Sequence, residues 1–192
     1  NNENNKKAAM RSNAVQILLK IIQQNMFNQK QQLVEPCLCA LRHITNRHSD
    51  MLLCQEQIRN LNGVTIITQL MSIKPRQWQC QKAALGLVRN LCSNQLNAMH
   101  LRQNCIIEKL MQVLYDAYTE VQMRTNQSMN PNLVVKVEDV NLLDIIDASA
   151  ASLLILAKDY QNQILMRDLD CIGFFVQMFY SPIMNNQKAA SS

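Results

Sequence analysis

The chain of 192 residues is long enough for one sizeable domain, and 48% of its residues are apolar. Three glycines and four prolines leave few turn-forming residues for a many-stranded sheet, so the composition favours helices joined by short polar connections. The net charge of +5 is compatible with an acidic partner and does not require nucleic acid. No apolar run approaches the roughly 20 residues that a membrane-spanning helix needs, so we expect no membrane insertion.

The first predicted helices lie near the amino terminus. The segment NAVQILLKII has an apolar face centred on Leu18, and EPCLCALRHITNRH, from Glu35 to His48, has one centred on Leu41. In both segments the apolar residues recur at i, i+3, i+4 and i+7, which predicts amphipathic helices. The second of these helices carries an arginine, Arg42, on its otherwise small and uncharged face.

The same order of elements returns along the rest of the chain. One series of long helices aligns on residues 49, 43 and 65 positions apart, and the following series on residues 47 and 65 positions apart. Short linking helices fit between them. The first series is centred on Leu18, Ile67, Leu110 and Phe175, the second on Leu41, Val88 and Leu153, and the linking helices span Met51 to Leu61, Leu96 to Asn104 and Gln161 to Leu169.

A period in the forties with three helices per unit is typical of armadillo repeats. We therefore expect an all-α, right-handed α-solenoid in which the third helices line a groove. A single array would comprise units over about 1–48, 49–95, 96–159 and 160–192, the last incomplete, and would be a piece of a longer array. The spacing of 65 requires an insertion, and the polar segment 126–139 is predicted to be a long loop. An unrelated helical bundle with accidental periodicity is the alternative.

The residues that could suggest metal binding or catalysis do not form the required patterns. We expect the seven cysteines to be reduced thiols, mostly in the core. Cys37 and Cys39 are about 200° apart around a helix, so they cannot join His43 in one metal site. Asp144 and Asp147 share a helical face, but no histidine or glycine-rich phosphate loop accompanies them. We therefore expect no enzyme activity, no metal and no cofactor.

Cations are predicted to line the groove. Arg42 and Arg89 are 47 residues apart at matching positions, and Lys82 lies seven residues before Arg89 on the same side of its helix. Stacked units would bring these side chains into a row that could pair with the carboxylates of an extended acidic peptide. Glu35 lies seven residues before Arg42 and could neutralise it. The alternative is a solvated charged face with no ligand.

The helix EPCLCALRHITNRH resembles armadillo helices of the β-catenin family almost residue for residue. The segments QKAALGLVRNL and ILAKDYQNQILMRDLDCIGFFVQMFYSPI, and the opening NNENNKK, resemble that family as well. The resemblance implies a divergent member covering roughly repeats eight to eleven of twelve. Glycines that are usual before the second helix are replaced by Asn13, Ala14 and Cys105.

The resemblance also implies a set of ligand-binding residues. Lys6 would contact an acidic ligand residue, and the other matching positions are Arg42, His43, Arg47, Lys82, Arg89 and Asn90. Cys39 lies one turn before Arg42, where a small residue leaves room for an apolar ligand side chain. We further expect the amide of Asn90 to hold the peptide backbone.

The implied partners are cadherin cytoplasmic tails, transcription factors of the T-cell-factor (TCF/LEF) type and the adenomatous polyposis coli protein. The implied locations are the cytoplasm, the nucleus and the adherens junction. Two other functions are weighed. Karyopherin-like transport adaptors grip basic peptides with tryptophan–asparagine ladders, whereas Trp78 is the single tryptophan here and stands at a helix start. Direct nucleic-acid binding is disfavoured because the aromatic side chains that stack on bases are scarce.

Overall fold

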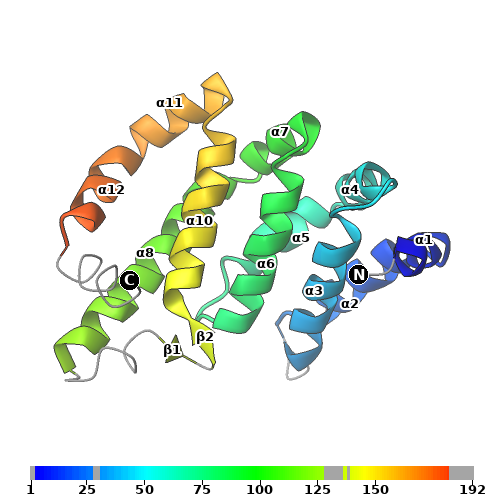
Figure 1. The fold of residues 1–192 in the computed structure, drawn as a ribbon, viewed down its shortest axis with the longest axis horizontal. Coiled ribbons are helices and arrows are strands. Elements are labelled where there is room, and N and C mark those ends of the chain that lie inside the picture. Colours follow the sequence, from blue (N-terminus) through cyan, green and yellow to red (C-terminus); the bar gives the residue numbers. More distant parts are fainter. Residues whose placement is uncertain (1–2, 28–30, 128–135, 138, 182–192) are drawn as a thin grey trace.

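The computed structural model describes residues 3–27, 31–127, 136–137 and 139–181. Its helices stack side by side into an all-α solenoid, which confirms the predicted fold class (Figure 1). The helices are α1 (Glu3–Arg11), α2 (Ala14–Asn25), η1 (Gln31–Leu33), α3 (Val34–Ile44), α4 (Met51–Asn60), α5 (Gly63–Leu70), α6 (Trp78–Leu91), α7 (Gln95–Gln103), α8 (Ile106–Gln127), α10 (Leu142–Leu156), α11 (Tyr160–Asp168) and α12 (Cys171–Phe179), and the two short strands are β1 (Lys136–Val137) and β2 (Val140–Asn141).

The third helices α3, α6 and α10 run next to one another across the molecule (Figure 1). Helix α6 packs against α3 on one side and α10 on the other, while α2 packs behind α3 and α8 behind α10. We propose that the units are α1 to α3, α4 to α6 and α7 to α10, followed by α11 and α12. None of the described helices is both long enough and apolar enough to cross a bilayer.

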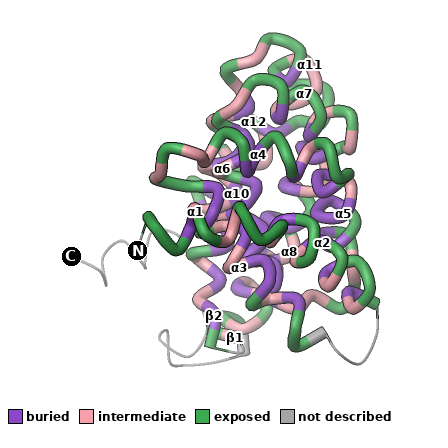
Figure 2. The backbone as a smooth tube through the Cα atoms, turned by 90° about the vertical axis from the view of Figure 1, so that its right-hand side faces the viewer, coloured by how far each residue is buried: buried purple, intermediate pink, exposed green. Residues whose placement is uncertain are grey.

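The apolar periodicity that predicted the helices also predicted their buried faces. Leu41 and Val88 are fully buried, and Leu153 is 3% exposed. In the other series Ile67 and Leu110 are fully buried, and Leu18 and Phe175 pack against the core while remaining partly exposed. One continuous apolar core therefore runs the length of the array, with the buried positions in the middle of the molecule and the exposed ones around it (Figure 2).

Buried amide side chains join successive units. Gln55 Nε2 donates to the backbone oxygens of Thr45 (3.1 Å) and Asn90 (3.2 Å), and Asn162 Nδ2 donates to the backbone oxygen of Leu156 (2.9 Å). These oxygens lie at the carboxyl ends of the third helices, where the last carbonyls lack partners within the helix. Gln55 and Asn162 are buried because they satisfy carbonyls that the core would otherwise leave unpaired.

A left-handed backbone residue precedes each second helix. The residues directly before α2, α5, α8 and α12 have φ between 51° and 59°; they are Asn13, Asn62, Cys105 and Asp170. Their spacings of 49, 43 and 65 are those of the helices that follow them. Asparagine and aspartate tolerate this conformation better than other residues with a side chain, which explains how the turns form without glycine.

The prediction of one irregular loop over 126–139 was wrong at both of its ends. Helix α8 continues through Gln127, and β1 pairs antiparallel with β2, Lys136 opposite Asn141 and Val137 opposite Val140. Asp139, with φ of 62°, turns the chain between the strands. The rest of the predicted loop, 128–135 and 138, lies outside the described residues.

Candidate peptide-binding groove

A cleft of about 610 Å³ lies between α1, α3, α4, α6 and α10. Six of the eight predicted site residues line it, and Cys39 and Lys82 lie outside it. We call this the basic cleft, lined by Lys6, Arg42, His43, Thr45, Asn46, Arg47, Met51, Gln55, Gly86, Arg89, Asn90, Ser93 and Ile155.

Because Gly86 has no side chain, the side chain of Arg42 fits between α3 and α6. A methyl group at position 86 would lie 2.5 Å from Arg42 Cδ and 3.3 Å from Arg42 Nη1. A glycine inside a helix costs about 1 kcal/mol relative to alanine, and this close approach is the physical reason for it here. Arg42 therefore lies across α6, half-buried, with its guanidinium at the cleft.

Lys6 is a buried cation tied to the turn after α3. Its side chain is only 8% exposed, and Nζ donates to the backbone oxygen of Asn46 at 2.6 Å. The bond fixes the charge at the edge of the basic cleft. Arg47 follows in the same turn, three residues beyond the end of α3, with a left-handed φ of 55°. The predicted helix ran from Glu35 to His48 and so included Arg47, which belongs instead to the exposed turn.

The side-chain amide nitrogen of Asn90 is engaged within the protein. Nδ2 donates to the backbone oxygen of Arg42 at 2.9 Å and to Thr45 Oγ1 at 3.0 Å. Both of its N–H groups therefore bind the end of α3, which leaves Oδ1 for a ligand. A peptide held here would have to donate to Asn90 through its own N–H groups, the reverse of an amide N–H binding a ligand carbonyl.

Lys82 lies outside the basic cleft and pairs with Asp144 of α10. Its Nζ is 2.7 Å from Asp144 Oδ2, and both side chains are nearly half exposed. Asp144 also stands in the first turn of α10, where a negative charge complements the helix dipole. The pairing escaped sequence reasoning because the two residues are 62 positions apart and on different helices.

Cys39 and Glu35 form a local pair on α3. The Cys39 thiol donates to Glu35 Oε1 at 3.0 Å. Burial, followed by this hydrogen bond and the charge of Glu35, raises the pKa of the Cys39 thiol to about 11, so the thiol stays neutral. Over the described parts of the chain no ion pair joins Glu35 to Arg42, so the predicted neutralisation of Arg42 is absent there.

The other cysteines resemble Cys39 in having no disulfide partner. None of the seven cysteines forms a disulfide, as expected, and Cys105 alone is exposed. Burial raises the pKa of Cys54 to about 11 and that of Cys92 to about 12. These thiols are neutral apolar side chains at physiological pH. Within the described ranges no three His, Cys, Asp or Glu side chains group closely enough to hold a metal ion.

All the charged side chains that line the basic cleft are positive. Four cations line it, Lys6, Arg42, Arg47 and Arg89, and no carboxylate does. Among the described residues none of these four cations has an ion-pair partner. Such a concave positive surface concentrates negative ligands.

Sequence reasoning missed the part of the cleft that comes from α10. Ile155 lies 65 residues after Asn90, and Asn90 lies 47 residues after His43, so all three hold the same position in their helices. The spacing of the third helices was therefore a sufficient signal to place Ile155 in the groove. The predicted site comprised cations together with Cys39, His43 and Asn90, and it included no aliphatic side chain.

These features define an armadillo-repeat solenoid with a basic groove along its third helices. Over its whole length the chain is similar to catenin beta and plakoglobin. It is 31% identical over 191 residues to catenin beta of Urechis caupo, 32% identical over 192 residues to catenin beta of Tripneustes gratilla, and 31% identical over 191 residues to human junction plakoglobin. The chain spans 23% of the length of each catenin beta and 25% of the plakoglobin.

A solved structure has the same fold. It comes from a study of a phosphorylation switch that controls the interaction between cadherin and beta-catenin. The TM-score is 0.72 with 26% sequence identity, over 84% of this chain and 31% of the other. No family model matches the chain.

Proposed function

We propose that the chain is a non-enzymatic interaction scaffold whose basic cleft binds an extended acidic peptide. The observation that carries the proposal is the set of four cations without carboxylate partners in one cleft. The cations come from α1, α3, the turn after α3, and α6, so their relative positions are set by the packing of the solenoid. A peptide that spans them needs no conformational change in the helices.

The small free energy of a single ion pair means that the ligand must have several acidic residues. An exposed ion pair contributes about 0.2–1 kcal/mol, so one carboxylate cannot hold a ligand. A peptide that is disordered when free also loses conformational entropy on binding. Affinity must therefore come from many contacts along the array, and it should fall with salt because the cations at the cleft are screened.

The comparisons suggest which acidic peptides to try first. The similar solved structure concerns the interaction of cadherin with beta-catenin, so the cadherin cytoplasmic tail is the first proposed partner. TCF/LEF-type transcription factors and the adenomatous polyposis coli protein are proposed as further ligands of the same groove. These partners would place the protein at the adherens junction, in the cytoplasm and in the nucleus.

The test is a titration of the chain with labelled cadherin-tail and T-cell-factor peptides at two salt concentrations. Replacing Arg42 and Arg89 together by alanine should weaken binding about tenfold, because tenfold is 1.4 kcal/mol, within the range of two ion pairs. The control is Arg167→Ala, which removes an exposed arginine of α11 outside the cleft. Equal loss in the control and the double variant, or no binding by either peptide, would disprove the proposal.

Gly86→Ala tests whether the placement of Arg42 matters. The added methyl group must displace the Arg42 side chain, so binding should weaken several-fold while the melting temperature holds or rises, since alanine favours the helix. The same change made on top of Arg42→Ala should cost no further affinity, because no side chain remains to be displaced. A loss of the same size in both backgrounds would show that Gly86 acts on the ligand directly.

A further inference from the structure

The row of arginines on the third helices ends in a leucine. Arg42 of α3 and Arg89 of α6 hold the same helical position, and the α10 residue that follows Arg89 by 65 positions is Leu154. Leu154 is 73% exposed, although it is apolar. At matching positions of successive third helices, two cations are therefore followed by an exposed apolar side chain.

The exposure of Leu154 is a property of its position in the unit. Arg89 at the matching position is exposed even though α6 is packed between α3 and α10. Both arginines at this position line the basic cleft. Leu154 itself lines neither the basic cleft nor the second cleft described next, but it adjoins Ile155, which lines both.

A second cleft continues the basic cleft past α10. It has a volume of about 580 Å³ and shares Ser93 and Ile155 with the basic cleft. Tyr160, which is 70% exposed, also lines it. We call Leu154, Ile155 and Tyr160 the apolar patch.

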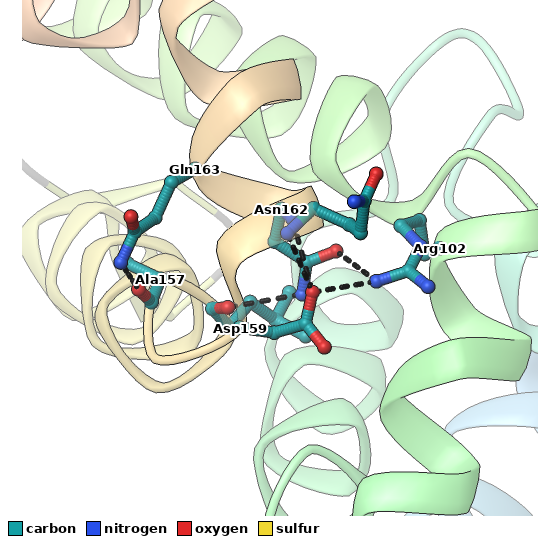
Figure 3. Close-up of polar contacts among 7 residues, drawn as sticks. Arg102, Ala157, Asp159, Asn162 and Gln163 are labelled. Atoms are coloured by element: carbon teal, nitrogen blue, oxygen red, sulfur yellow. Dashed lines mark hydrogen bonds and ion pairs between the residues drawn. The ribbon is translucent and has the colours of Figure 1, made fainter.

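The carboxylate beside the apolar patch is already neutralised. Asp159 Oδ1 accepts from Arg102 Nη1 at 2.7 Å and from the backbone N–H groups of Gln161 and Asn162 at 2.9 and 3.2 Å, capping α11 (Figure 3). Figure 3 shows Asp159 and Asn162 turned toward Arg102, which also donates to Asn162 Oδ1 at 3.3 Å. A negative ligand crossing from the basic cleft therefore meets no free charge of its own sign at Asp159.

We propose that the apolar patch binds an apolar side chain of the same acidic peptide that occupies the basic cleft. Packed helices lie about 8–10 Å apart, and an extended chain advances about 3.3 Å per residue. The apolar residue therefore stands about three residues from the carboxylate that pairs with Arg89. This inference rests on the proposed function and narrows its ligand class to acidic peptides with a leucine, isoleucine or phenylalanine at that spacing.

The test compares two synthetic fluorescent peptides by anisotropy. One has a run of glutamates, a two-residue Gly-Ser spacer and a leucine; the other has serine in place of that leucine. The leucine peptide should bind the unaltered chain about five- to tenfold more tightly. The ratio should persist at high salt, where both affinities fall, because burial of a leucine is not screened as an ion pair is.

Two variants test whether the preference for the leucine peptide arises from the apolar patch. Leu154→Arg extends the row of arginines, so the serine peptide should bind more tightly and the preference for leucine should shrink to about twofold or less. Tyr160→Ser should reduce the preference without adding charge. The control is Ile172→Arg, which adds the same charge at an equally exposed residue of α12, a helix that supplies no residue to either cleft. Matching melting temperatures show that the variants are folded.

The outcomes separate this inference from the proposed function. Equal, salt-sensitive binding of the two peptides would overturn the role of the apolar patch and leave the acidic ligand intact. A leucine preference that Leu154→Arg and Tyr160→Ser do not change would overturn it as well. Failure of both peptides to bind would overturn the proposed function itself.

Discussion

Cys105 holds a backbone conformation that suits glycine. Its φ of 56° places its β-carbon against its own backbone, and the equivalent residues in the other units are asparagine or aspartate. The side chain is exposed, so it gains little from burial in return. This turn is therefore a point of local strain at the start of α8.

Cys105→Gly should raise the free energy of unfolding by about 1 kcal/mol, since glycine adopts this φ without the steric cost. Urea denaturation measures the change. Cys105→Ala is the control, because it removes the thiol but keeps the β-carbon, and it should leave stability nearly unchanged. Equal gains in both variants would show that the thiol and not the backbone was the source of instability.

The positions of the groove residues could be predicted one at a time, but their pairings could not. Repeat spacing was enough to align Arg42 with Arg89, and both line the basic cleft. The pairing of Lys82 with Asp144 and the bonds from Asn90 to the end of α3 join residues at least 45 positions apart. Such contacts depend on how far one helix is rotated against the next, which a periodic pattern does not record.

At the scale of elements, the connection between α5 and α6 is held to α8 by one carboxylate. Asp116 Oδ2 accepts from Arg76 Nε at 2.7 Å and also from Lys74, while Oδ1 accepts from Gln112 at 2.9 Å. Burial alone would raise the pKa of Asp116, but the hydrogen bonds from Lys74, Arg76 and Gln112 outweigh it and lower the pKa below its usual value of 3.8.

Asp116→Asn should lower the free energy of unfolding at pH 7 by about 1–3 kcal/mol, because Arg76, only 5% exposed, loses its charged acceptor. A lowered pKa in the folded state means that the carboxylate stabilises the fold above pH 3.8 and loses this effect as the pH falls through the folded-state pKa. The two proteins should therefore converge in stability below pH 3.8. Denaturation curves from pH 7 to 2 measure this, and a constant difference across the range would exclude the ionised carboxylate as the cause.

The short helices were the elements that sequence reasoning placed best. The expected helices over 51–61, 96–104 and 161–169 agree with α4, α7 and α11 to within one residue at each end. Repetition made this possible, since each unit supplied an independent alignment of the same pattern. The β1–β2 pair had no such support, because it occurs in one unit only and its two-residue strands carry too few side chains to show an alternating pattern.

For the whole molecule, stability should be unevenly distributed along the array. Each unit of a solenoid contacts only its neighbours, so a central helix gains from two interfaces and a terminal one from a single interface. Helix α6 has nine buried residues between α3 and α10, whereas α11 buries only Asn162. Local unfolding is therefore expected to begin at helices with few buried residues, such as α11 and also α1, which buries only Lys6.

Hydrogen exchange should be slowest at the backbone amides of α6 and faster by at least tenfold at those of α1 and α11. Mass spectrometry of the intact chain after timed exchange, with proteolysis into peptides, gives these rates. The proteolytic peptide that contains Leu85 and Leu87 reports on α6, and the peptide that contains Met166 reports on α11. Uniform protection from end to end would mean that the array unfolds as a single unit instead of unit by unit.

The side-by-side spacing of α3, α6 and α10 also bears on the shape of a ligand. A β-strand returns a side chain to the same face every two residues, about 6.6 Å, which is out of step with helices about 8–10 Å apart. A polyproline II helix returns every three residues, about 9.3 Å. The repeat distance of that left-handed conformation matches the helix spacing, so such a peptide would present the same face to Arg42, Arg89 and Leu154 in turn. A peptide that binds as proposed is therefore expected to adopt the polyproline II conformation.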